Sequence, residues 1–301
     1  MQVTILGNNS ALPAFGRHPT AQAVSIGGEA ILLDCGEGTQ IQMERYGIRW
    51  RKILHIFISH LHGDHYFGLP GLINSMSLLG RTSPLHLYAP AAIMDILNPI
   101  LQVADTRLSY EFHFHPIEEN AEAILVDTPT FQVKAFPVEH RIACHGFVIT
   151  EKNNARKLLP DKCREYEVPT YFFERIKAGE DYERKDGLLV KSEWVTAAGI
   201  PPRRYAYCAD TLCTDTFLHH IRSVDLLYHE STYLHDDVAK ATMRYHTTAR
   251  QAAELAARAE VGHLLLGHYS SKYKDTAAFQ QEAAAYFSPV TASVEGAIYE
   301  V

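Results

Sequence analysis

The sequence contains few cysteines and no long apolar run. Its 301 residues include five cysteines, an odd number, and none of them form a C-x-x-C pair. Neither a disulfide framework nor a thiolate metal site is therefore indicated. No apolar stretch approaches the roughly 20 residues that a helix needs to cross a bilayer. The chain begins directly with the strand-like run 2–6 and lacks the basic start of a signal peptide, so we expect a cytoplasmic protein with no membrane partner.

Positive charge is also in deficit. The chain carries 28 Lys and Arg against 35 Asp and Glu, a net charge of −7 at pH 7. This balance argues against a general nucleic-acid binder, because phosphate contacts need clustered cations. Residues 152–195 nevertheless hold ten Lys and Arg against nine Asp and Glu, a balance of +1, which leaves 18 against 26, or −8, elsewhere. An acidic metal-binding cleft would explain the negative charge outside residues 152–195. The net negative charge of the chain is therefore compatible with a polyanionic substrate that is bound locally.

The sequence does contain a regular alternation of strand and helix signals. The apolar runs 23–26 and 30–34, separated by Gly27-Gly28, predict a hairpin. Further strands are expected at 53–59, 85–88, 123–126, 131–136, 146–149, 204–208, 226–229 and 263–266, and helices after 36–39 and at 67–79, 90–103, 248–259 and 276–287. This number of strands, with helices between and after them, predicts an α/β fold: an αββα sandwich of two mixed β-sheets flanked by helices. We expect one domain over residues 1–301.

The segment 152–195 does not follow this pattern. It is charge-dense and weakly periodic, yet it contains the apolar-aromatic stretch 168–173. We expect it to be an insertion that projects from the sandwich as an arm. Its residues alone leave open whether this arm is a mobile solvated loop or a functional element.

The strongest chemical signal is the run 60–65 (H-L-H-G-D-H), which places three imidazoles and one carboxylate within six residues. His60 and His62 are two positions apart, so both leave the same face of an extended chain. Gly63 permits a sharp turn that lets the last two residues face the same cavity from another direction. Imidazole together with carboxylate suits Zn²⁺ and its neighbours. Histidines clustered by chance in a loop are a poor alternative, so the run predicts a metal-dependent hydrolase.

Four ligands in one turn cannot surround two metals, so others must come from elsewhere. Three residues follow apolar strand-like runs, from which a side chain can reach a cleft at a sheet edge: His140, Asp210 and His268. Taken singly, each fits an ordinary loop residue better than a ligand. The remaining histidines are expected to be structural or surface residues; they include His55, His86, His113, His115, His219 and His263.

Several longer stretches resemble the ribonuclease Z family of the metallo-β-lactamase superfamily, endonucleases that trim the 3′ end of precursor tRNA. They are residues 34–40 (D-C-G-E-G-T-Q), 58–72 around the metal run, 229–232 (H-E-S-T), 246–249 (H-T-T-A) and 267–273 (G-H-Y-S-S-K-Y). They span nearly the whole chain in the family's order. The resemblance implies two Zn²⁺ per chain, with His60, His62 and His140 on one ion, Asp64, His65 and His268 on the other, and Asp210 bridging them.

The resemblance also implies the reaction. A water between two zinc ions is acidic enough to supply hydroxide near neutral pH. Attack on a backbone phosphorus would release the 3′ trailer, leaving a 3′-hydroxyl on the tRNA and a 5′-phosphate on the trailer. Asp64 is expected to act as general base as well as ligand, and His246, oriented by Glu230, to protonate the leaving oxygen. From the residues alone, His246 could instead be a non-catalytic neighbour of a helix N-cap at Thr247 or Thr248.

The same resemblance gives the arm a role. An insertion at this place in the family grips the tRNA elbow, far from the cut, so its basic residues are expected to contact phosphates. The candidates are Lys152, Arg156, Lys157 and Lys177, with Lys162, Arg164, Arg184 and Lys185 in the same segment. The family further implies a homodimer in which the arm of one subunit serves the active site of the other.

Two stretches depart from the family pattern. Where family arms commonly carry a Gly-Pro element, this chain has V-P-T-Y at 168–171. The loop 12–20 keeps Pro13 and Arg17 but lacks a lysine present in many bacterial relatives. Arg17 is a candidate for contacting the RNA end, and the cleavage position relative to the discriminator base or a CCA end stays open.

Two other functional classes share parts of this pattern. A small-molecule hydrolase of the same superfamily, such as a phosphodiesterase, sulfatase or thioester hydrolase, would keep the metal ligands but would not need the arm. A catalytically dead RNA-binding module would be expected to have lost ligands, whereas all seven are present.

Overall fold

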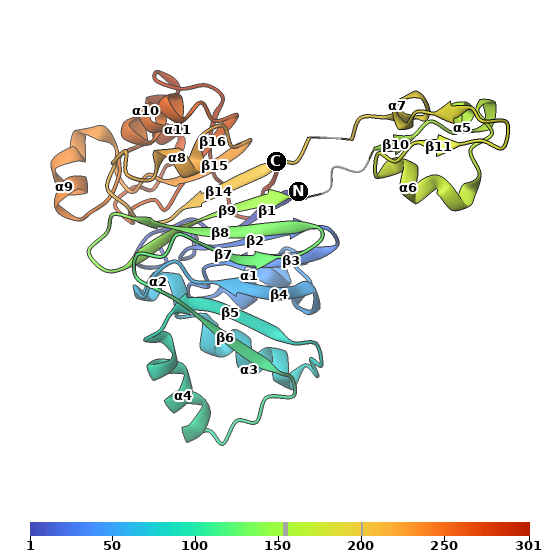
Figure 1. The fold of residues 1–301 in the computed structure, drawn as a ribbon. Coiled ribbons are helices and arrows are strands. Elements are labelled where there is room, and N and C mark those ends of the chain that lie inside the picture. Colours follow the sequence, from blue (N-terminus) through green and yellow to red (C-terminus); the bar gives the residue numbers. More distant parts are fainter. Residues whose placement is uncertain (153–155, 200) are drawn as a thin grey trace.

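The computed structural model describes residues 1–152, 156–199 and 201–301. In this part of the chain, two seven-stranded mixed sheets face each other, with helices on their outer sides (Figure 1). The first sheet contains, in spatial order, β18 (Ile298–Glu300), β1 (Gln2–Gly7), β2 (Ala21–Ile26), β3 (Glu29–Leu33), β4 (Ile53–Phe57), β5 (Leu85–Pro90) and β6 (Phe112–Ile117). The second contains β17 (Val290–Ala292), β16 (His263–Gly267), β15 (Leu226–Glu230), β14 (Arg204–Cys208), β9 (Cys144–Glu151), β8 (Phe131–Val138) and β7 (Ala123–Asp127). The expected αββα sandwich is confirmed.

Alternating apolar side chains of the two sheets fill the layer between them. This core includes Ile31, Phe57, Phe147, Tyr205 and Leu265, all fully buried. Full burial of a large apolar side chain contributes roughly 1.5–3 kcal/mol relative to its exposure. The inter-sheet layer is therefore a main source of stability, and it fixes the edges of both sheets relative to each other.

Helices cover the outer face of each sheet. On the first sheet these are α1 (Thr39–Arg45), α3 (Leu69–Leu78) and α4 (Ile93–Val103); on the second they are α8 (Leu218–Ile221), α10 (Ala249–Ala259) and α11 (Ala277–Ala284). Helix α10 begins at a capping box, in which Thr248 Oγ1 accepts from Gln251 N and Gln251 Oε1 accepts from Thr248 N. The box fixes the backbone just before the helix, where His246 lies.

Some boundaries differ from those expected from the sequence. The hairpin of β2 and β3 is present, and Gly27 and Gly28 both have positive φ at its turn. The helix expected at 67–79 is present as α3, and a short helix that was not expected, α2 (Gly63–Tyr66), ends two residues before it. The helix expected at 90–103 begins only at Ile93, because Pro90 still belongs to β5. Strand β6 was missed, since its histidines interrupt the apolar signal.

The arm connects two neighbouring strands, because β9 and β14 pair in antiparallel fashion. It contains β10 (Lys157–Leu158), α5 (Pro160–Glu165), η2 (Thr170–Phe172), α6 (Phe173–Lys177), β11 (Tyr182–Glu183), β12 (Leu189–Val190), α7 (Ser192–Val195) and β13 (Thr196–Ala197). Figure 1 shows these elements set apart from the sandwich. They share a small core of their own, formed by Cys163, Val168, Phe172, Ile176, Val190 and Val195. Two of these core residues come from the stretch 168–173.

All five cysteines are free, and four of them are buried. Within the described residues, no helix combines the length and the apolar character that crossing a membrane requires.

Candidate metal centre and catalytic site

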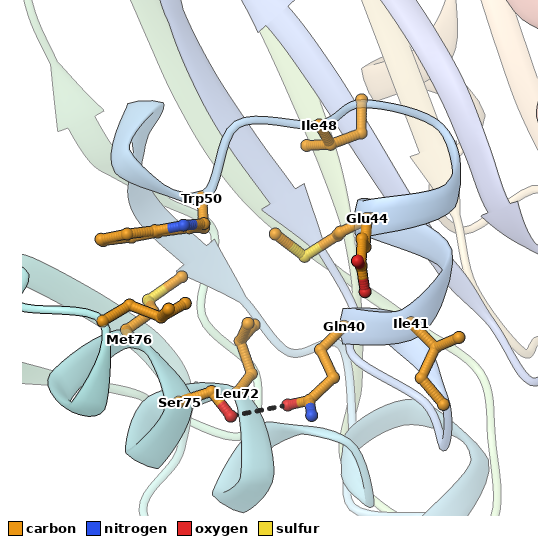
Figure 2. A pocket seen from close by; sticks show the side chains of 10 residues that line it. Gln40, Ile41, Glu44, Ile48, Trp50, Leu72, Ser75 and Met76 are labelled. Carbon is orange, nitrogen blue, oxygen red and sulfur yellow. Dashed lines mark hydrogen bonds between the residues drawn. The ribbon is translucent and has the colours of Figure 1, made fainter.

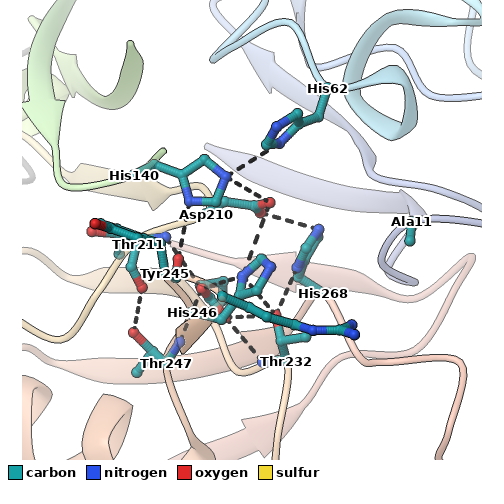
Figure 3. A network of polar contacts seen from close by, with 12 residues as sticks. Ala11, His62, His140, Asp210, Thr211, Thr232, Tyr245, His246, Thr247 and His268 are labelled. Atoms are coloured by element: carbon teal, nitrogen blue, oxygen red, sulfur yellow. Dashed lines mark hydrogen bonds and ion pairs between the residues drawn. The ribbon is translucent and has the colours of Figure 1, made fainter. Parts of the chain in front are cut away.

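The candidate ligands meet at one edge of the sandwich because they follow the ends of neighbouring strands. His60 and His62 come after β4, His140 after β8, Asp210 after β14 and His268 after β16. Strands β14, β15 and β16 run parallel, so their carboxyl ends lie together. Helix α2 adds the remaining two, Asp64 and His65. The structure thus brings all seven sequence candidates into one cluster, part of which is visible in Figure 3.

The cluster divides into two sets of ligand atoms. In the first, His62 Nδ1 lies 3.0 Å from His60 Nε2 and 3.2 Å from His140 Nε2. Asp210 Oδ2 lies 3.7 Å from His60 Nε2 and 3.9 Å from His140 Nε2. Since zinc binds nitrogen and oxygen at about 2.0–2.2 Å, tetrahedral ligand atoms are roughly 3.4 Å apart. The four atoms therefore match the spacing around one ion.

The second set uses the other oxygen of Asp210. Asp210 Oδ1 lies 3.0 Å from His268 Nε2 and 3.4 Å from His65 Nε2. Asp64 Oδ2 lies 3.4 Å from His268 Nε2 and 3.6 Å from His65 Nε2, and it accepts a hydrogen bond from the backbone N–H of Ala11 at 2.7 Å. Because each oxygen of Asp210 faces a different set, this carboxylate lies where a bridging ligand would.

The charge of the cluster fits a cation. His65 Nε2 and Asp210 Oδ1 are buried, and neither has a hydrogen-bond partner in the described part of the chain. Burial disfavours the charged form of His65, yet the carboxylates of Asp210 and Asp34 outweigh burial and raise its pKa well above the ordinary value. A metal ion would satisfy both unpartnered atoms and the excess negative charge. Imidazole and carboxylate donors are also those that zinc-like ions prefer.

Asp34 fixes the orientation of His65 from behind. It is fully buried at the end of β3 with a φ of 55°. Its carboxylate accepts from His65 Nδ1 at 2.7 Å, from Ser59 N at 2.7 Å and from Ser59 Oγ at 2.9 Å, and also from the Tyr207 hydroxyl. With Nδ1 held in this way, His65 Nε2 faces the cluster. Such outer contacts set the tautomer and the basicity of a ligating histidine.

Other ligands have comparable support. His140 Nδ1 lies 3.0 Å from the backbone carbonyl oxygen of Tyr245. His268 Nδ1 lies 2.9 Å from Thr232 Oγ1, and the backbone of His268 has a φ of 60°. His60 Nδ1 is 3.0 Å from Ser59 Oγ and 3.4 Å from the buried Cys144 Sγ. The ligating nitrogens are therefore preorganised by the protein.

The stretch 34–40 contacts the metal run directly through its backbone. Cys35 N donates to the carbonyl oxygen of His65 at 2.7 Å, and Gly68 N donates to that of Cys35 at 2.9 Å. A Cβ at Gly36 would lie only 2.5 Å from the carbonyl oxygen of Asp64. The glycine is required because the two segments approach so closely.

Glu230, the last residue of β15, is completely buried. It accepts hydrogen bonds from the backbone N–H groups of Thr211, Thr232 and Thr247 at 3.1, 2.9 and 3.0 Å, and from His246 Nδ1 at 2.9 Å. With Nδ1 bound to the carboxylate, the other ring nitrogen of His246 is available at the cleft that this residue lines.

The protonated form of His246 is favoured at neutral pH. Burial opposes the imidazolium, but the carboxylates of Glu230 and Asp210 outweigh burial and raise the pKa of His246 to about 9. The alternative interpretation, in which His246 is only the neighbour of a helix N-cap, requires a cap at Thr247 or Thr248, and Thr248 does cap helix α10. The two interpretations are compatible, because the cap fixes the backbone while the ring faces Glu230 and the cleft.

The cleft above the cluster has a volume of about 530 Å³ and contains two arginines that sequence reasoning missed, Arg141 and Arg244. Both are exposed, and Arg244 Nη1 donates to the Tyr233 hydroxyl at 3.3 Å. Phe67 and Ser270 also line the cleft. The sequence offered one signal that could have identified them: each arginine lies within two residues of a histidine that faces the cluster. Both guanidinium groups bring positive charge to the cleft, and guanidinium is a group that can bind anionic oxygens through paired hydrogen bonds.

Arg17 does not extend freely into this cleft. Its guanidinium donates to Asn9 Oδ1 at 2.9 Å and to the backbone carbonyls of Lys274 and Tyr273 at 2.9 and 2.6 Å. Burial lowers its pKa. Arg17 thus ties the N-terminal loop to the loop that follows β16, both of which border the cluster.

The arm elements are set apart from the sandwich, whose strand ends carry the cluster (Figure 1). Lys152 pairs with Asp127 of the sandwich, Lys177 pairs with a glutamate on its own helix, and Arg156 donates to a threonine within the arm. Lys157 is exposed. Exposed ion pairs contribute little to stability, so these side chains can exchange partners at small cost.

One comparison with known proteins covers only the N-terminal part of the chain, and another shows only its fold. Residues 1–161 match the sequence-family model described as "Anti-Pycsar protein Apyc1", so the N-terminal half belongs to that sequence family. This span contains the metal run but ends before Asp210, His246 and His268. The metallo-β-lactamase fold protein YhfI from Bacillus subtilis superposes with a TM-score of 0.69 at 19% identity over 99% of this chain and 98% of that chain, which shows the fold.

Other comparisons extend over the whole chain. Ribonuclease Z of Porphyromonas gingivalis is 41% identical over 293 residues, 97% of this chain and 96% of that protein. Ribonuclease Z of Cytophaga hutchinsonii is 39% identical over 301 residues, 100% of this chain and 96% of that protein. The short form of human tRNase Z superposes with a TM-score of 0.72 at 26% identity, covering 100% of this chain and 99% of that chain. The chain therefore belongs to the ribonuclease Z family of endoribonucleases, and its sandwich is the metallo-β-lactamase fold.

Proposed function

We propose that this endoribonuclease removes the 3′ trailer from precursor tRNA with two Zn²⁺ per chain, leaving a 3′-hydroxyl on the tRNA and a 5′-phosphate on the trailer. The observation that carries the proposal is the division of seven ligands into two sets that share Asp210, beside the Glu230–His246 pair. Relatives named ribonuclease Z and tRNase Z support the substrate class. A cytoplasmic location goes with that substrate.

Each catalytic side chain has a distinct task in this proposal. The bound metals would acidify a water molecule and neutralise charge on the phosphate. Asp64, at the floor of the cleft, would accept the proton of the attacking water in addition to its role as ligand. As the bond from phosphorus to the 3′ oxygen breaks, His246 would donate its proton to that oxygen, and Glu230 would stabilise the charged ring until then. Arg141 and Arg244 would hold the phosphates on either side of the cut.

A homodimer is supported by apolar side chains on the outer face of the first sheet. Ile41, Phe67, Leu78 and Leu79, from the region of α1 and α3, are between 55% and 79% exposed. Ile41 and Leu79 line a groove of about 420 Å³ between α1 and α3 (Figure 2). Exposed apolar patches of this kind mark protein interfaces. We infer that a second copy of the chain covers this face, which would let the arm of one subunit serve the other's cleft.

Metal content tests the centre. After dialysis against zinc-free buffer, wild-type protein should retain close to two zinc ions per chain by mass spectrometry, and Asp34→Asn should lower zinc affinity roughly 10–100-fold, because His65 loses its orienting carboxylate. Chelator competition measures the affinity. Asp105→Asn is the matched control, since Asp105 also has positive φ but is exposed. A metal content far below two, or equal affinities in Asp34→Asn and wild type, would contradict this assignment.

The pH profile of cleavage tests the Glu230–His246 pair. His246 keeps its proton up to about pH 9 because of the nearby carboxylates. Removing one of them in Glu230→Gln lowers that pKa, so the alkaline limb of kcat/KM should move to lower pH. His246→Ala should lose activity by roughly 10²–10⁴-fold. Both variants should retain the wild-type metal content. An alkaline limb that stays in place in Glu230→Gln would exclude His246 as the acid.

Deleting the arm separates tRNA cleavage from hydrolysis of small diesters. Glu151 N donates to the Arg203 carbonyl oxygen at 2.9 Å, so an Asn-Gly turn can replace residues 152–202 and close the β9–β14 hairpin. The arm has its own core, so the sandwich should fold without it. We expect cleavage of precursor tRNA to fall steeply, while hydrolysis of bis-p-nitrophenyl phosphate persists. Unchanged tRNA processing would refute a role for the arm and would favour a small-molecule hydrolase.

The subunit interface is tested by charge insertion. Leu79→Asp should convert a dimer into a monomer, as measured by light scattering, because a buried unpaired carboxylate is costly. Ile298→Asp is the control, since Ile298 is 59% exposed, close to the 55% of Leu79, but lies on the edge strand β18. A wild-type chain that is monomeric at micromolar concentration, or a dimer that survives Leu79→Asp, would rule out this interface.

A further inference from the structure

A second group of metal-ligating side chains lies on the outer face of the second sheet. Glu122 immediately precedes β7, and His219 and His220 lie on α8. One ligand atom from each of the three residues lies within 4.8 Å of the other two. None of them takes part in the proposed catalytic reaction. From the sequence, His219 was expected to be only a structural or surface residue.

We propose that Glu122, His219 and His220 form a third divalent-cation site of the zinc class. His220 Nε2 lies 3.6 Å from Glu122 Oε2, the same separation as between His65 Nε2 and Asp64 Oδ2 in the catalytic cluster. An ion at ordinary zinc bond lengths of about 2.0–2.2 Å reaches both atoms with little movement. The two imidazole centroids are 3.8 Å apart, so the third ligand is close by.

Neighbouring side chains hold two of the three ligands in place. Lys134 Nζ lies 2.7 Å from Glu122 Oε1, which fixes the carboxylate and leaves Oε2 free to face His220. The His220 ring is almost buried and stacks on Phe136 with centroids 4.9 Å apart. Contacts of this type orient metal ligands. Because Lys134 is itself positive, we expect micromolar rather than nanomolar affinity.

The exposed side of the site gives an ion access from solvent. Glu122 is 49% exposed and His219 is also exposed, so water can complete the coordination shell. Two histidines, one carboxylate and an open position are a common donor set for zinc. The site differs from an acidic surface cluster because two of its three donors are imidazoles.

The location of the site suggests what an ion would do there. Helix α8 follows the loop that begins at Asp210, and β8, which carries Lys134 and Phe136, leads to His140. Glu122 immediately precedes β7, which pairs with β8. An ion bound between Glu122 and α8 would therefore connect the β7–β8 hairpin, which leads to His140, with the helix that follows the Asp210 loop. Because it binds only the folded chain, it would also raise the unfolding temperature.

Zinc counting tests the proposal without reference to activity. The full-length chain, Glu122→Gln, His219→Asn and the control His113→Asn are each equilibrated with micromolar Zn²⁺ and analysed by mass spectrometry. His113 is an accessible histidine outside the site, 42% exposed, on strand β6. Wild type and His113→Asn should bind one more zinc per chain than the two site variants, and zinc should raise their unfolding temperature further. The catalytic ligands are identical in all four proteins, so their zinc content cancels in the comparison.

Two results would overturn the inference. One is equal zinc content in all four proteins, whatever the content of the catalytic centre. The other is an anomalous diffraction map at the zinc edge that shows peaks at the catalytic centre but none between Glu122 and His220. A peak at Glu122 with an empty catalytic centre would instead contradict only the proposed catalytic function. Unfolding curves in chelator confirm that the exposed substitutions leave the fold intact.

Discussion

The buried carboxylate of Asp210, shared between two groups of imidazoles, is the constraint on which the arrangement of the site depends. Its two oxygens face different ligand sets, and one of them has no hydrogen-bond partner in the described part of the chain. A buried charge is costly unless it is paired. Strands β14 and β16 bring Asp210 and His268 to the same edge as the metal run of the first sheet. The carboxylate of Asp210 therefore lies beside several imidazoles, which offset the cost of burying its charge. Cation binding and the order of this edge are therefore linked.

Features set by residues close together in the chain could be predicted from the sequence, whereas few of the contacts between distant segments could. The run 60–65 carries its ligand spacing within one turn, and the hairpin at Gly27-Gly28 is set by two residues. His140, Asp210 and His268 have no such local pattern. Their positions after strand-like runs made them candidates, and only the family resemblance assigned them as ligands, because strand order across two sheets decides that they converge. The orienting role of Asp34 depends on a contact with His65, 31 residues away. Strand β6 was missed because His113 and His115 interrupt the apolar pattern that would indicate a strand.

The distribution of charge reconciles an acidic protein with a polyanionic substrate. Carboxylates gather where metal ions would neutralise them, whereas Arg141 and Arg244 stand exposed at the cleft beside them. Many cations of the arm already pair with acids of the same segment, as Lys177 and Lys191 do. Binding to phosphates would exchange one set of exposed ion pairs for another, at modest net gain per contact. Recognition of RNA by this chain would then depend on several weak contacts placed at a fixed distance from the cut.

That distance is set by the two strands from which the arm arises. Strand β9 runs from Cys144, whose sulfur lies 3.4 Å from His60 Nδ1, to Glu151 at the base of the arm. Its neighbour β14 runs back from Arg204 to Cys208, two residues before Asp210. At about 3.3 Å per residue, the 8 residues of β9 span roughly 25 Å and the 5 residues of β14 roughly 15 Å. Both are largely buried, and residues 147–150 of β9 pair with residues 204–207 of β14. An insertion at this hairpin is therefore connected to the candidate metal centre through two paired strands of the sheet, and in the proposed function these strands would set how far the RNA contacts of the arm lie from the cut.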